Sequence, residues 1–377
     1  MKILITGRYD QEYNRNLILI NGLKAKGVSI AEAPYKLKKD FEPSILQQMG
    51  GPFDFVFLPS FTHYDVRFIR KKLKLPVVFD PLISRYLTKV GDYKSVHPYS
   101  PRAVKNFLKD RLSMQAADIV IADTEGHRQY FINKIGISPE KIHVVPVGVD
   151  TNDFNPSGFE VDPSVGSKVS STKKSIVHSG NKSSGEPVKE SGAFTVGFYG
   201  TYIPLHGIQK IIHAALALQE YPDIKFQIIG SGPTEGEMKK LLAKLKPDNL
   251  ELIPQVPYKE LPGLISTFDI SLGIFGDSLK AQLVIPNKIF HYCAMGKAVI
   301  TMESPAISEV FTPGEDIITT DGTSSDLAAK ILELKNKREL RESIAENGMK
   351  LIREKYNQNC IAEMFLDAVK EIVKNGL

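Results

Sequence analysis

The stretch from Pro286 to Thr319, PNKIFHYCAMGKAVITMESPAISEVFTPGEDIIT, decides the fold class of this chain. It combines a polar loop, a helical segment that ends at Gly296, a short apolar strand AVIT and a second helical segment. A short apolar strand between helical segments is typical of one turn of a β-α-β winding. The stretch therefore predicts part of a parallel sheet that is covered by helices on both faces.

Apolar strand segments recur on both sides of this stretch, with helical patterns between them. They lie in the first half at 2–6, 54–59, 76–79, 118–122 and 143–147, and in the second half at TVGFYG, KFQIIG, ELIP, DISLGIF, AVIT and DIIT. This alternation predicts an α/β fold with two wound parallel sheets in series. Ligands of such sheets bind at the carboxyl ends of the strands, so we expect two Rossmann-like domains that face a central cleft.

Length and composition also favour a two-domain globular protein. The chain has 377 residues, of which 42% are hydrophobic and 24% are charged, and a single core rarely grows to that size. No run of 18 apolar residues occurs in the sequence, which argues against a transmembrane helix. Two cysteines, Cys293 and Cys360, give neither a disulfide framework nor a metal-ligand spacing. We therefore expect a cytoplasmic protein without a secretory signal.

The segments NKIFHYCAMGK, AVIT and ESPAISEVF, in this order, resemble the donor-binding region of the GT-B glycosyltransferases, in particular family 4. The motifs IPLHG (203–207) and GIFG followed by IPNK (273–288) resemble a subgroup of these enzymes. The resemblance implies transfer of a hexose-type sugar from a nucleotide diphosphate donor to a glycan or lipid-linked acceptor. It also implies retention of anomeric configuration, and neither a metal nor another cofactor.

The resemblance assigns roles to parts of the chain. Residues 1–155 form an N-terminal acceptor-side domain, residues 194–355 form the nucleotide-sugar-binding domain, and the final helix, 356–377, crosses back to the first domain. The segment 156–193 is rich in Ser, Gly and Lys and has little apolar periodicity. Its composition predicts a flexible linker.

Glycine turns after the strands of the second half are the first candidates for donor binding, because backbone N–H groups at such turns attract phosphate. Family 4 enzymes usually carry G-R-x-x-x-x-K-G at residues 200–207, where this chain has Thr201 and His206 in place of Arg and Lys. His206 can still donate a hydrogen bond and become a cation beside a diphosphate. The resemblance implies donor contacts from Gly200, Thr201, His206, Gly230, Ser231, Gly232, Gln255, Val256, Asn287, Lys288 and His291. For His206 and the Gly230 turn, a structural role without ligand contact is an equal alternative.

Two glutamates of the family's donor loop are absent from this chain. Alignment on AMGKAVI places Leu283 and His291 at their positions. The loop instead carries Lys280 and Lys288, and we infer that these ammonium groups take over the phosphate clamp and stabilise the departing nucleotide. A solvated surface cation remains the alternative for each lysine.

Polar residues also follow the strands of the first half. Asp80 follows the segment PVVF and is the nearest polar candidate for contact with the donor sugar, so it is counted with Lys280 and Lys288 as catalytic. The other candidates, on the acceptor or phosphate side, are Gly7, Arg8, Arg15, His63, Glu125 and His127. Gly7 would let the backbone approach a ligand, and a surface salt bridge is an equal alternative for each arginine.

Two basic amphipathic segments bear on the partners of the protein. The segment RFIRKKLKL (67–75) has five cations and no acid, and a second segment sets Arg102, Lys105, Lys109 and Arg111 beside apolar residues. Such a face can lie on an anionic membrane, which predicts peripheral contact with the inner membrane face. A solvated face on a core helix is the alternative. No nucleic-acid recognition motif accompanies the charge.

Three function classes follow from these observations. The leading interpretation is a glycosyltransferase of polysaccharide biosynthesis. The missing loop carboxylates also fit a non-catalytic subunit that binds a sugar nucleotide. An epimerase of sugar nucleotides would need a pair of acid–base carboxylates, and no convincing pair is evident in the sequence. A nicotinamide dehydrogenase is disfavoured because the sequence lacks a strand–GxGxxG–helix–acid unit.

Overall fold

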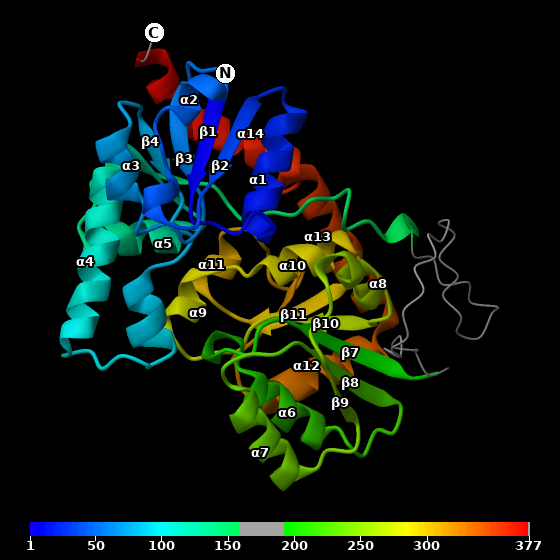
Figure 1. Cartoon of the computed structure of the whole chain (residues 1–377). Helices are drawn as coiled ribbons and strands as arrows, with labels where there is room; N and C mark the ends of the chain where they lie inside the picture. Colours follow the sequence, from blue (N-terminus) through cyan, green and yellow to red (C-terminus); the bar gives the residue numbers. More distant parts are fainter. Residues whose placement is uncertain (159–191, 376–377) are drawn as a thin grey trace, which may run out of the picture.

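The computed structural model describes residues 1–158 and 192–375, and it contains two six-stranded parallel sheets. Figure 1 shows one body above the other, which we call the N-lobe and the C-lobe. The prediction of an α/β fold with two wound sheets is confirmed. The predicted linker, 156–193, lies almost wholly outside the described residues.

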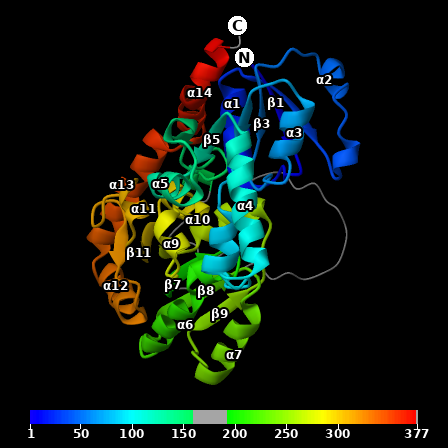
Figure 2. The ribbon, with the colours of Figure 1, turned by 90° about the vertical axis from the view of Figure 1, so that its left-hand side faces the viewer.

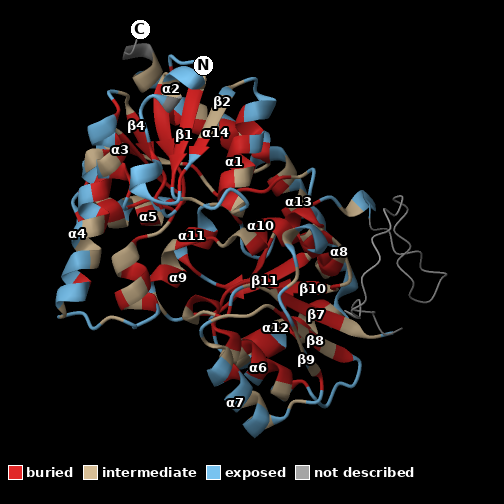
Figure 3. Cartoon of the chain, viewed as in Figure 1, coloured by how far each residue is buried: buried red, intermediate tan, exposed pale blue. Residues whose placement is uncertain are grey.

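The N-lobe sheet has the strand order β2-β1-β3-β4-β5-β6. Its strands are β1 (Lys2–Gly7), β2 (Ser29–Pro34), β3 (Phe55–Leu58), β4 (Val77–Phe79), β5 (Ile119–Ala122) and β6 (Ile142–Val144). Its helices are α1 (Asn14–Ala25), α2 (Ile45–Gln48), α3 (Val66–Lys72), α4 (Pro101–Ala116) and α5 (Glu125–Tyr130), which the π-helical residues Phe131–Ile135 continue. The inner strands are buried on both faces, as their red colour in Figure 3 shows, because helices cover the sheet from both sides.

The C-lobe sheet has the order β12-β11-β10-β7-β8-β9. Its strands are β7 (Phe194–Tyr199), β8 (Ile224–Ile229), β9 (Leu250–Ile253), β10 (Ile270–Leu272), β11 (Ala298–Met302) and β12 (Ile318–Thr320). Its helices are α6 (Ile208–Ala217), α7 (Glu235–Leu245), α8 (Leu261–Ser266), α9 (Leu279–Leu283), α10 (Asn287–Ala294), α11 (Pro305–Ser308), α12 (Ser324–Asn336) and α13 (Arg338–Lys355). Among the helices of the described ranges, none has the length and apolar content to cross a membrane.

The last helix, α14 (Gln358–Asn375), packs on the N-lobe rather than on the C-lobe that precedes it in the chain (Figure 1). Phe365 contributes a ring whose centroid lies 5.1 Å from that of Phe57 on β3. Gly22 on α1 permits close approach, because a Cβ atom there would lie 2.0 Å from the carbonyl oxygen of Gln358. Apolar burial and the small glycine therefore fix α14 against α1 and the sheet.

The chain crosses between the lobes twice, and the two crossings lie side by side. The N–H of Val149, after β6, donates to the carbonyl oxygen of Tyr356, between α13 and α14 (3.1 Å). The N–H of Thr151 donates to Oε1 of Gln358 (3.0 Å). These bonds tie the outgoing and the returning segment together at one edge of the molecule.

Candidate active site between the lobes

Loops that follow strands of the two sheets meet between the lobes (Figure 2). Thr124, after β5, donates its hydroxyl to the carbonyl oxygen of Leu283 at the end of α9 (2.6 Å). Ser278, after β10, donates its hydroxyl to Oδ1 of Asp92 (2.8 Å), which ends the π-helical segment Leu87–Asp92 of the N-lobe. The carboxyl ends of strands from both sheets therefore share one interface, as expected for a ligand site of wound sheets.

Lys288, in the first turn of α10, is buried without a counter-charge. The residue is 4% exposed, and its Nζ has no hydrogen-bond partner within the described chain. The Nζ lies 3.8 Å from the centroid of the Phe198 ring on β7. Burial lowers the pKa of Lys288 well below its ordinary value. An unpaired buried ammonium is costly in free energy, so the position is suited to an anionic ligand.

Two glycines shape the backbone beside this ammonium. Gly200 has a φ of +149°, and a Cβ atom there would lie 2.6 Å from Nζ of Lys288. Gly230 has a φ of +143°, and a Cβ atom there would lie 2.1 Å from the carbonyl oxygen of Gly200. Any other residue would be strained at both positions. Gly230 therefore lets the ends of β7 and β8 approach each other, and Gly200 lets the Lys288 ammonium lie against the backbone at the end of β7.

The other predicted donor residues of these turns surround the two glycines. Ser231 donates its hydroxyl to Oε1 of Gln255 (3.1 Å), which joins the ends of β8 and β9. The exposed members of this group are Thr201 and Gln255, and the partly buried ones are Gly232, Val256 and Asn287. The turns after β7, β8 and β9 thus form one polar edge of the C-lobe.

His206 lies near both predicted clamp lysines but is neutral. Its Nδ1–H donates to the carbonyl oxygen of Thr201, which leaves Nε2 as an acceptor. Burial lowers the pKa of His206 well below its ordinary value, and the positive charges of Lys288 and Lys280 lower it further. A cationic His206 would therefore require a bound anion.

Lys280, in α9, reaches across to the N-lobe. Its Nζ lies 3.8 Å from Oδ2 of Asp92 and 6.0 Å from the centroid of the Tyr93 ring. Burial lowers the pKa of Lys280, although the charges of Asp92 and Asp123 oppose the shift. The structure thus brings both predicted lysines near one imidazole, that of His206, but it pairs only Lys280 with a carboxylate.

His291, the predicted ribose ligand, lies inside an aromatic cluster, and its Nε2 has no hydrogen-bond partner in the described chain. The residue is 0% exposed, its ring stacks on Phe154 (3.8 Å between centroids), and its Nδ1 bonds to the hydroxyl of Tyr199 (2.5 Å). Burial lowers the pKa of His291 to about 3. The alignment with a family glutamate assigned His291 to the donor loop, whereas the structure places it on α10, on a side that packs against Tyr199 at the end of β7.

Arg15 and Asp80, two predicted site residues, form an ion pair with each other, which for Arg15 agrees with the salt-bridge alternative except that the pair is buried. Nε of Arg15 donates to Oδ2 of Asp80 (2.8 Å), and both side chains are 1% exposed. The other guanidinium donors bond to the carbonyl oxygens of Val145 (2.8 Å) and Pro146, and Oδ1 of Asp80 accepts from the N–H of Leu82 (2.8 Å). Burial raises the pKa of Asp80, although Arg15 opposes the shift. Neither group is free to act on a sugar or a phosphate.

Gly7 and Arg8, at the end of β1, are also held by the N-lobe itself. Gly7 has a φ of +119°, and a Cβ atom there would lie 2.9 Å from Cγ2 of Thr62, so a side chain and not a ligand fills the space. Nε of Arg8 donates to Oδ1 of Asp65 (2.9 Å), whose side chain is buried. Arg8 therefore forms a salt bridge, which was the alternative to a ligand contact in the sequence analysis. Part of its guanidinium remains exposed.

His63 is enclosed in the N-lobe and does not face an open cleft. It is 2% exposed, its Nε2 lies 3.5 Å from Oδ1 of Asp110 on α4, and its ring meets that of Phe79 edge to face. Burial lowers the pKa of His63 to about 3. The structure thus places His63 in the core of the N-lobe, next to Asp110 and Phe79.

The start of α5 is held by a carboxylate from the C-lobe. Glu309, after α11, accepts hydrogen bonds from the N–H groups of Glu125 (2.6 Å) and Gly126 (2.8 Å). The side chain of Glu125 instead bonds to Arg128 on its own helix (3.0 Å). The structure therefore brings the backbone of Glu125, rather than its carboxylate, to the interface.

Three acidic residues of the interface, Asp92, Asp123 and Glu309, are not among the residues that the sequence singles out. Asp123 directly follows β5, bonds to Nδ1 of the buried His127 (2.5 Å), and lies near enough to Lys280 to affect its pKa. Its position directly after a strand could have identified Asp123 as a site residue from the sequence. No sequence pattern marks Asp92 or the contact of Glu309 with the other lobe.

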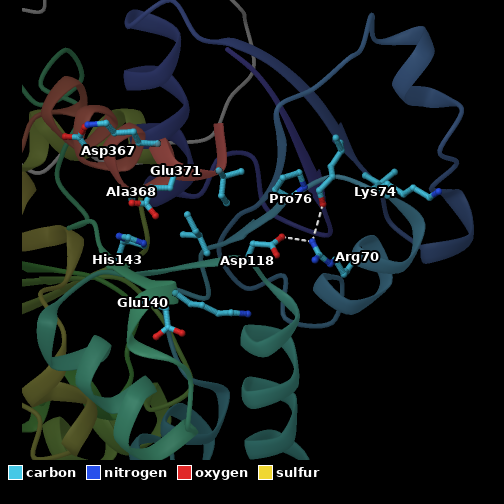
Figure 4. A pocket seen from close by; sticks show the side chains of 15 residues that line it. Arg70, Lys74, Pro76, Asp118, Glu140, His143, Asp367, Ala368 and Glu371 are labelled. Carbon is cyan, nitrogen blue, oxygen red and sulfur yellow. Dashed lines mark hydrogen bonds and ion pairs between the residues drawn. The ribbon is translucent and has the colours of Figure 1, made fainter. Parts of the chain in front are cut away.

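A cavity of about 1040 Å³ lies away from this interface (Figure 4). It is lined by residues that precede β4, β5 and β6 and by α14, among them Pro76, Asp118, Lys141 and Glu371. Arg70 and Asp118 form an ion pair at its edge (2.5 Å). Because ligands of wound sheets bind at the opposite, carboxyl ends of the strands, this cavity is not the candidate site.

Another cavity, of about 430 Å³, lies on the side of the interface. It is formed by Gln282 of α9 together with residues that follow β11 and β12, including Glu303, Ser304 and Asp321. Its position at the carboxyl ends of two C-lobe strands places open space next to the end of the donor loop.

Comparison with known proteins agrees with this geometry. Residues 181–351 match the family model of glycosyl transferases group 1, and residues 52–153 match that of glycosyltransferase family 4. An uncharacterized glycosyltransferase of Methanocaldococcus jannaschii is 23% identical over 172 residues, which are 44% of this chain and 44% of the relative. An MMP alpha-(1->4)-mannosyltransferase of Mycolicibacterium hassiacum is 23% identical over 235 residues, 61% of this chain and 48% of the relative. The chain thus matches less than half the length of these curated relatives.

Solved structures resemble the whole chain. HepE from Anabaena, solved with UDP and glucose, superposes with a TM-score of 0.70 at 15% identity and covers 98% of this chain and 100% of its own. Sucrose-phosphate synthase from Thermosynechococcus elongatus gives a TM-score of 0.72 at 11% identity, with 100% of both chains covered. At such identities the likeness establishes the fold. Together with the two family models, it supports a GT-B glycosyltransferase of the family 4 type.

Proposed function

We propose that the protein transfers a sugar from a nucleotide diphosphate donor to a glycan or lipid-linked acceptor in polysaccharide biosynthesis. The observation that carries the proposal is the unpaired ammonium of Lys288, buried beside Gly200 at the carboxyl end of β7. A diphosphate seated there would supply the missing counter-charge, and the ammonium would stabilise the nucleotide as it leaves.

The proposed reaction retains anomeric configuration, with the leaving phosphate assisting removal of the acceptor proton. Such a mechanism depends on phosphate stabilisers more than on a strong protein base. Lys288 and Lys280 supply that stabilisation, and Lys280 would exchange Asp92 for a phosphate oxygen. The engagement of Asp80 by Arg15 fits this scheme, since no step needs a free carboxylate at that position.

A second candidate function is non-catalytic binding of a sugar nucleotide. Two observations favour it: Leu283 occupies the position of one family glutamate, and the enclosed His291 occupies that of the other. The two functions differ in turnover. A transferase hydrolyses its donor slowly without an acceptor, whereas a pure binding subunit leaves the donor intact when acceptors are absent or present.

We expect one class of sugar nucleotide to raise the melting temperature of the protein. A ligand that binds only the folded state at about 100 times its Kd adds about 2.7 kcal/mol to the free energy of unfolding. The measurement is a thermal-shift screen against UDP, GDP, ADP and CDP sugars, with the free sugars as controls. Unchanged melting with every nucleotide would contradict donor binding.

We also propose that the outer face of α4 makes peripheral contact with an anionic membrane. Val104, Leu108 and Leu112 are 55%, 45% and 37% exposed, although they are apolar and one helical turn apart. Lys105 and Arg111 flank this stripe and are also exposed. Helix α4 itself lies on the surface that faces the viewer in Figure 2. Apolar residues between cations are typical of a helix that lies in a membrane interface.

Replacing both Leu108 and Leu112 with glutamine should weaken binding to vesicles of phosphatidylcholine and phosphatidylglycerol by roughly tenfold, because less apolar surface enters the bilayer. Cosedimentation with the vesicles measures the effect. Tyr221→Gln, on an exposed apolar residue of the C-lobe, is the matched control. Equal binding of the double variant and the control would remove α4 from the contact.

A further inference from the structure

A cluster of cations surrounds Tyr64 in the N-lobe. The guanidinium carbon of Arg85 lies 4.6 Å from the centroid of the Tyr64 ring, and Nζ of Lys109 lies 4.4 Å from it. Nη2 of Arg85 also donates to the hydroxyl of Tyr64 (3.0 Å). One aromatic ring therefore orders two cations that come from different parts of the chain, the loop after β4 and helix α4.

Three more cations lie close to Lys109. The charges of Lys38, Arg67 and Lys105, together with that of Arg85, lower the pKa of Lys109, after burial as the largest cause. We call these five residues and Tyr64 the Tyr64 cluster; its cations are Lys38, Arg67, Arg85, Lys105 and Lys109. They belong to segments that follow β2, β3 and β4 and to α4.

The cations of the Tyr64 cluster make no ion pair within the described parts of the chain. None of its five cations forms an ion pair with a carboxylate there, and Nε of Arg85 is buried without a hydrogen-bond partner. The neighbouring carboxylate of Asp110 is turned inward, where it accepts from the hydroxyl of Ser84 (2.7 Å) and from the N–H of Arg85 (3.0 Å). Burial raises the pKa of Asp110 to about 6, although the charge of Arg85 opposes the shift, so this one carboxylate offsets only part of the positive charge. The five like charges repel one another, so an anion would stabilise the arrangement.

We propose that the Tyr64 cluster binds a phosphate group of the acceptor substrate. The ring of Tyr64 fixes Arg85, whose free Nε–H can donate to a phosphate oxygen while the Lys109 ammonium supplies a second charge. The cluster lies at the loops after β3 and β4, on the carboxyl edge of the N-lobe sheet, where the acceptor is expected. The assignment to the acceptor rests on the proposed glycosyl transfer, whereas phosphate binding by the cluster does not.

The phosphate could belong to a water-soluble ester or to a lipid head group, and the two sources share the same chemistry. The probes are glycerol 3-phosphate for the soluble source and vesicles of phosphatidylcholine with phosphatidylglycerol for the lipid source. The readout is the rate at which Lys105 and Lys109 are acetylated in the full chain, followed by peptide mass spectrometry. Lys350, exposed on α13, is the internal reference, and sodium chloride keeps the ionic strength constant.

We expect at least one probe to slow acetylation of Lys105 and Lys109 several-fold without affecting Lys350, and we expect Arg85→Gln to abolish that protection. In Lys109→Gln, only Lys105 can be followed, and we expect the probe to protect it less than in the wild type. This variant gives a second measurement if Arg85→Gln does not fold. Protection by glycerol 3-phosphate indicates a soluble phosphate ester, and protection by vesicles alone indicates a lipid phosphate.

Two results would overturn the phosphate site. One is equal acetylation with and without both probes. The other is vesicle protection that persists in Arg85→Gln, which would mean that α4 merely lies on the membrane. Lys288→Ala separates this proposal from the donor site, because it should lose the nucleotide-dependent rise in melting temperature and retain protection of Lys105 and Lys109.

Discussion

Replacing Lys288 with alanine should lower kcat/KM for sugar transfer by about 100-fold, the usual loss when one preorganised group that stabilises transition-state charge is removed. The side chain is buried, lacks a counter-charge in the described chain and contacts the Gly200 turn. Its charge therefore acts in a medium of low dielectric constant, where it is more effective than in water. Steady-state kinetics with the donor identified by the thermal-shift screen give the measurement.

Lys288→Met is the matched variant for this experiment, because methionine fills a similar volume and carries no charge. We expect it to fold like the wild type and to lose activity to the same extent as alanine. Lys350→Ala, on the exposed face of α13, should leave activity unchanged. If Lys288→Met retained full activity, packing rather than charge would be the role of this residue.

The pKa of Lys288 predicts a pH dependence of donor binding. Burial lowers this pKa in the free protein, whereas a bound diphosphate would raise it by favouring the ammonium. Above the lowered pKa, donor binding must therefore take up a proton, and donor affinity should fall as pH increases. Calorimetric titrations in buffers of different ionisation enthalpy detect the proton, and Lys288→Met should abolish this contribution.

Asp80→Asn should reduce the free energy of unfolding by about 3–5 kcal/mol, the cost of leaving one member of a buried ion pair without its partner. The Arg15 guanidinium is 1% exposed and would remain charged inside the N-lobe. Denaturant unfolding followed by circular dichroism measures the loss. The double variant Arg15→Met, Asp80→Leu should recover most of it, because apolar residues of similar size often replace a buried ion pair at little cost.

The same variants test the role that the sequence predicted for Asp80. A catalytic carboxylate would show a large fall in kcat for Asp80→Asn with little change in unfolding. The double variant would then be stable and inactive. An active double variant would establish that the pair only holds α1 against the loop after β4.

The fold could be predicted because its signal is repeated along the chain. Eleven of the twelve strands in the described chain were predicted from short, mainly apolar runs, and such runs are typical of strands that are buried on both faces. Strand β2 was missed because it lies at the edge of the sheet and carries polar and partly exposed residues such as Ser29 and Glu32. Its sequence therefore lacks the apolar run on which the other predictions depend.

The site could be predicted less completely. Strand-end glycines such as Gly200, and Lys288 in the donor loop, are marked by position, and the structure brings them together. Arg15, His63 and His291 also lie near strand or helix ends, but their partners are 65, 47 and 92 residues away in the sequence. Whether such a side chain faces a cleft or a core depends on packing that no local pattern records. The contact of Glu309 with α5 is hidden for the same reason, since it joins two separately folded sheets.

The paired crossings at Val149 and Tyr356 limit how the molecule can open. Because the hydrogen bonds at these crossings join residues that follow β6 to residues just before and at the start of α14, we expect the two bodies to swing about this edge. Bonds far from that edge, such as those of Thr124 with Leu283 and of Ser278 with Asp92, would then break and re-form once in each swing. A large ligand would enter and leave on the side opposite this edge. The strength of these bonds between the lobes would then determine how often the lobes open on that side.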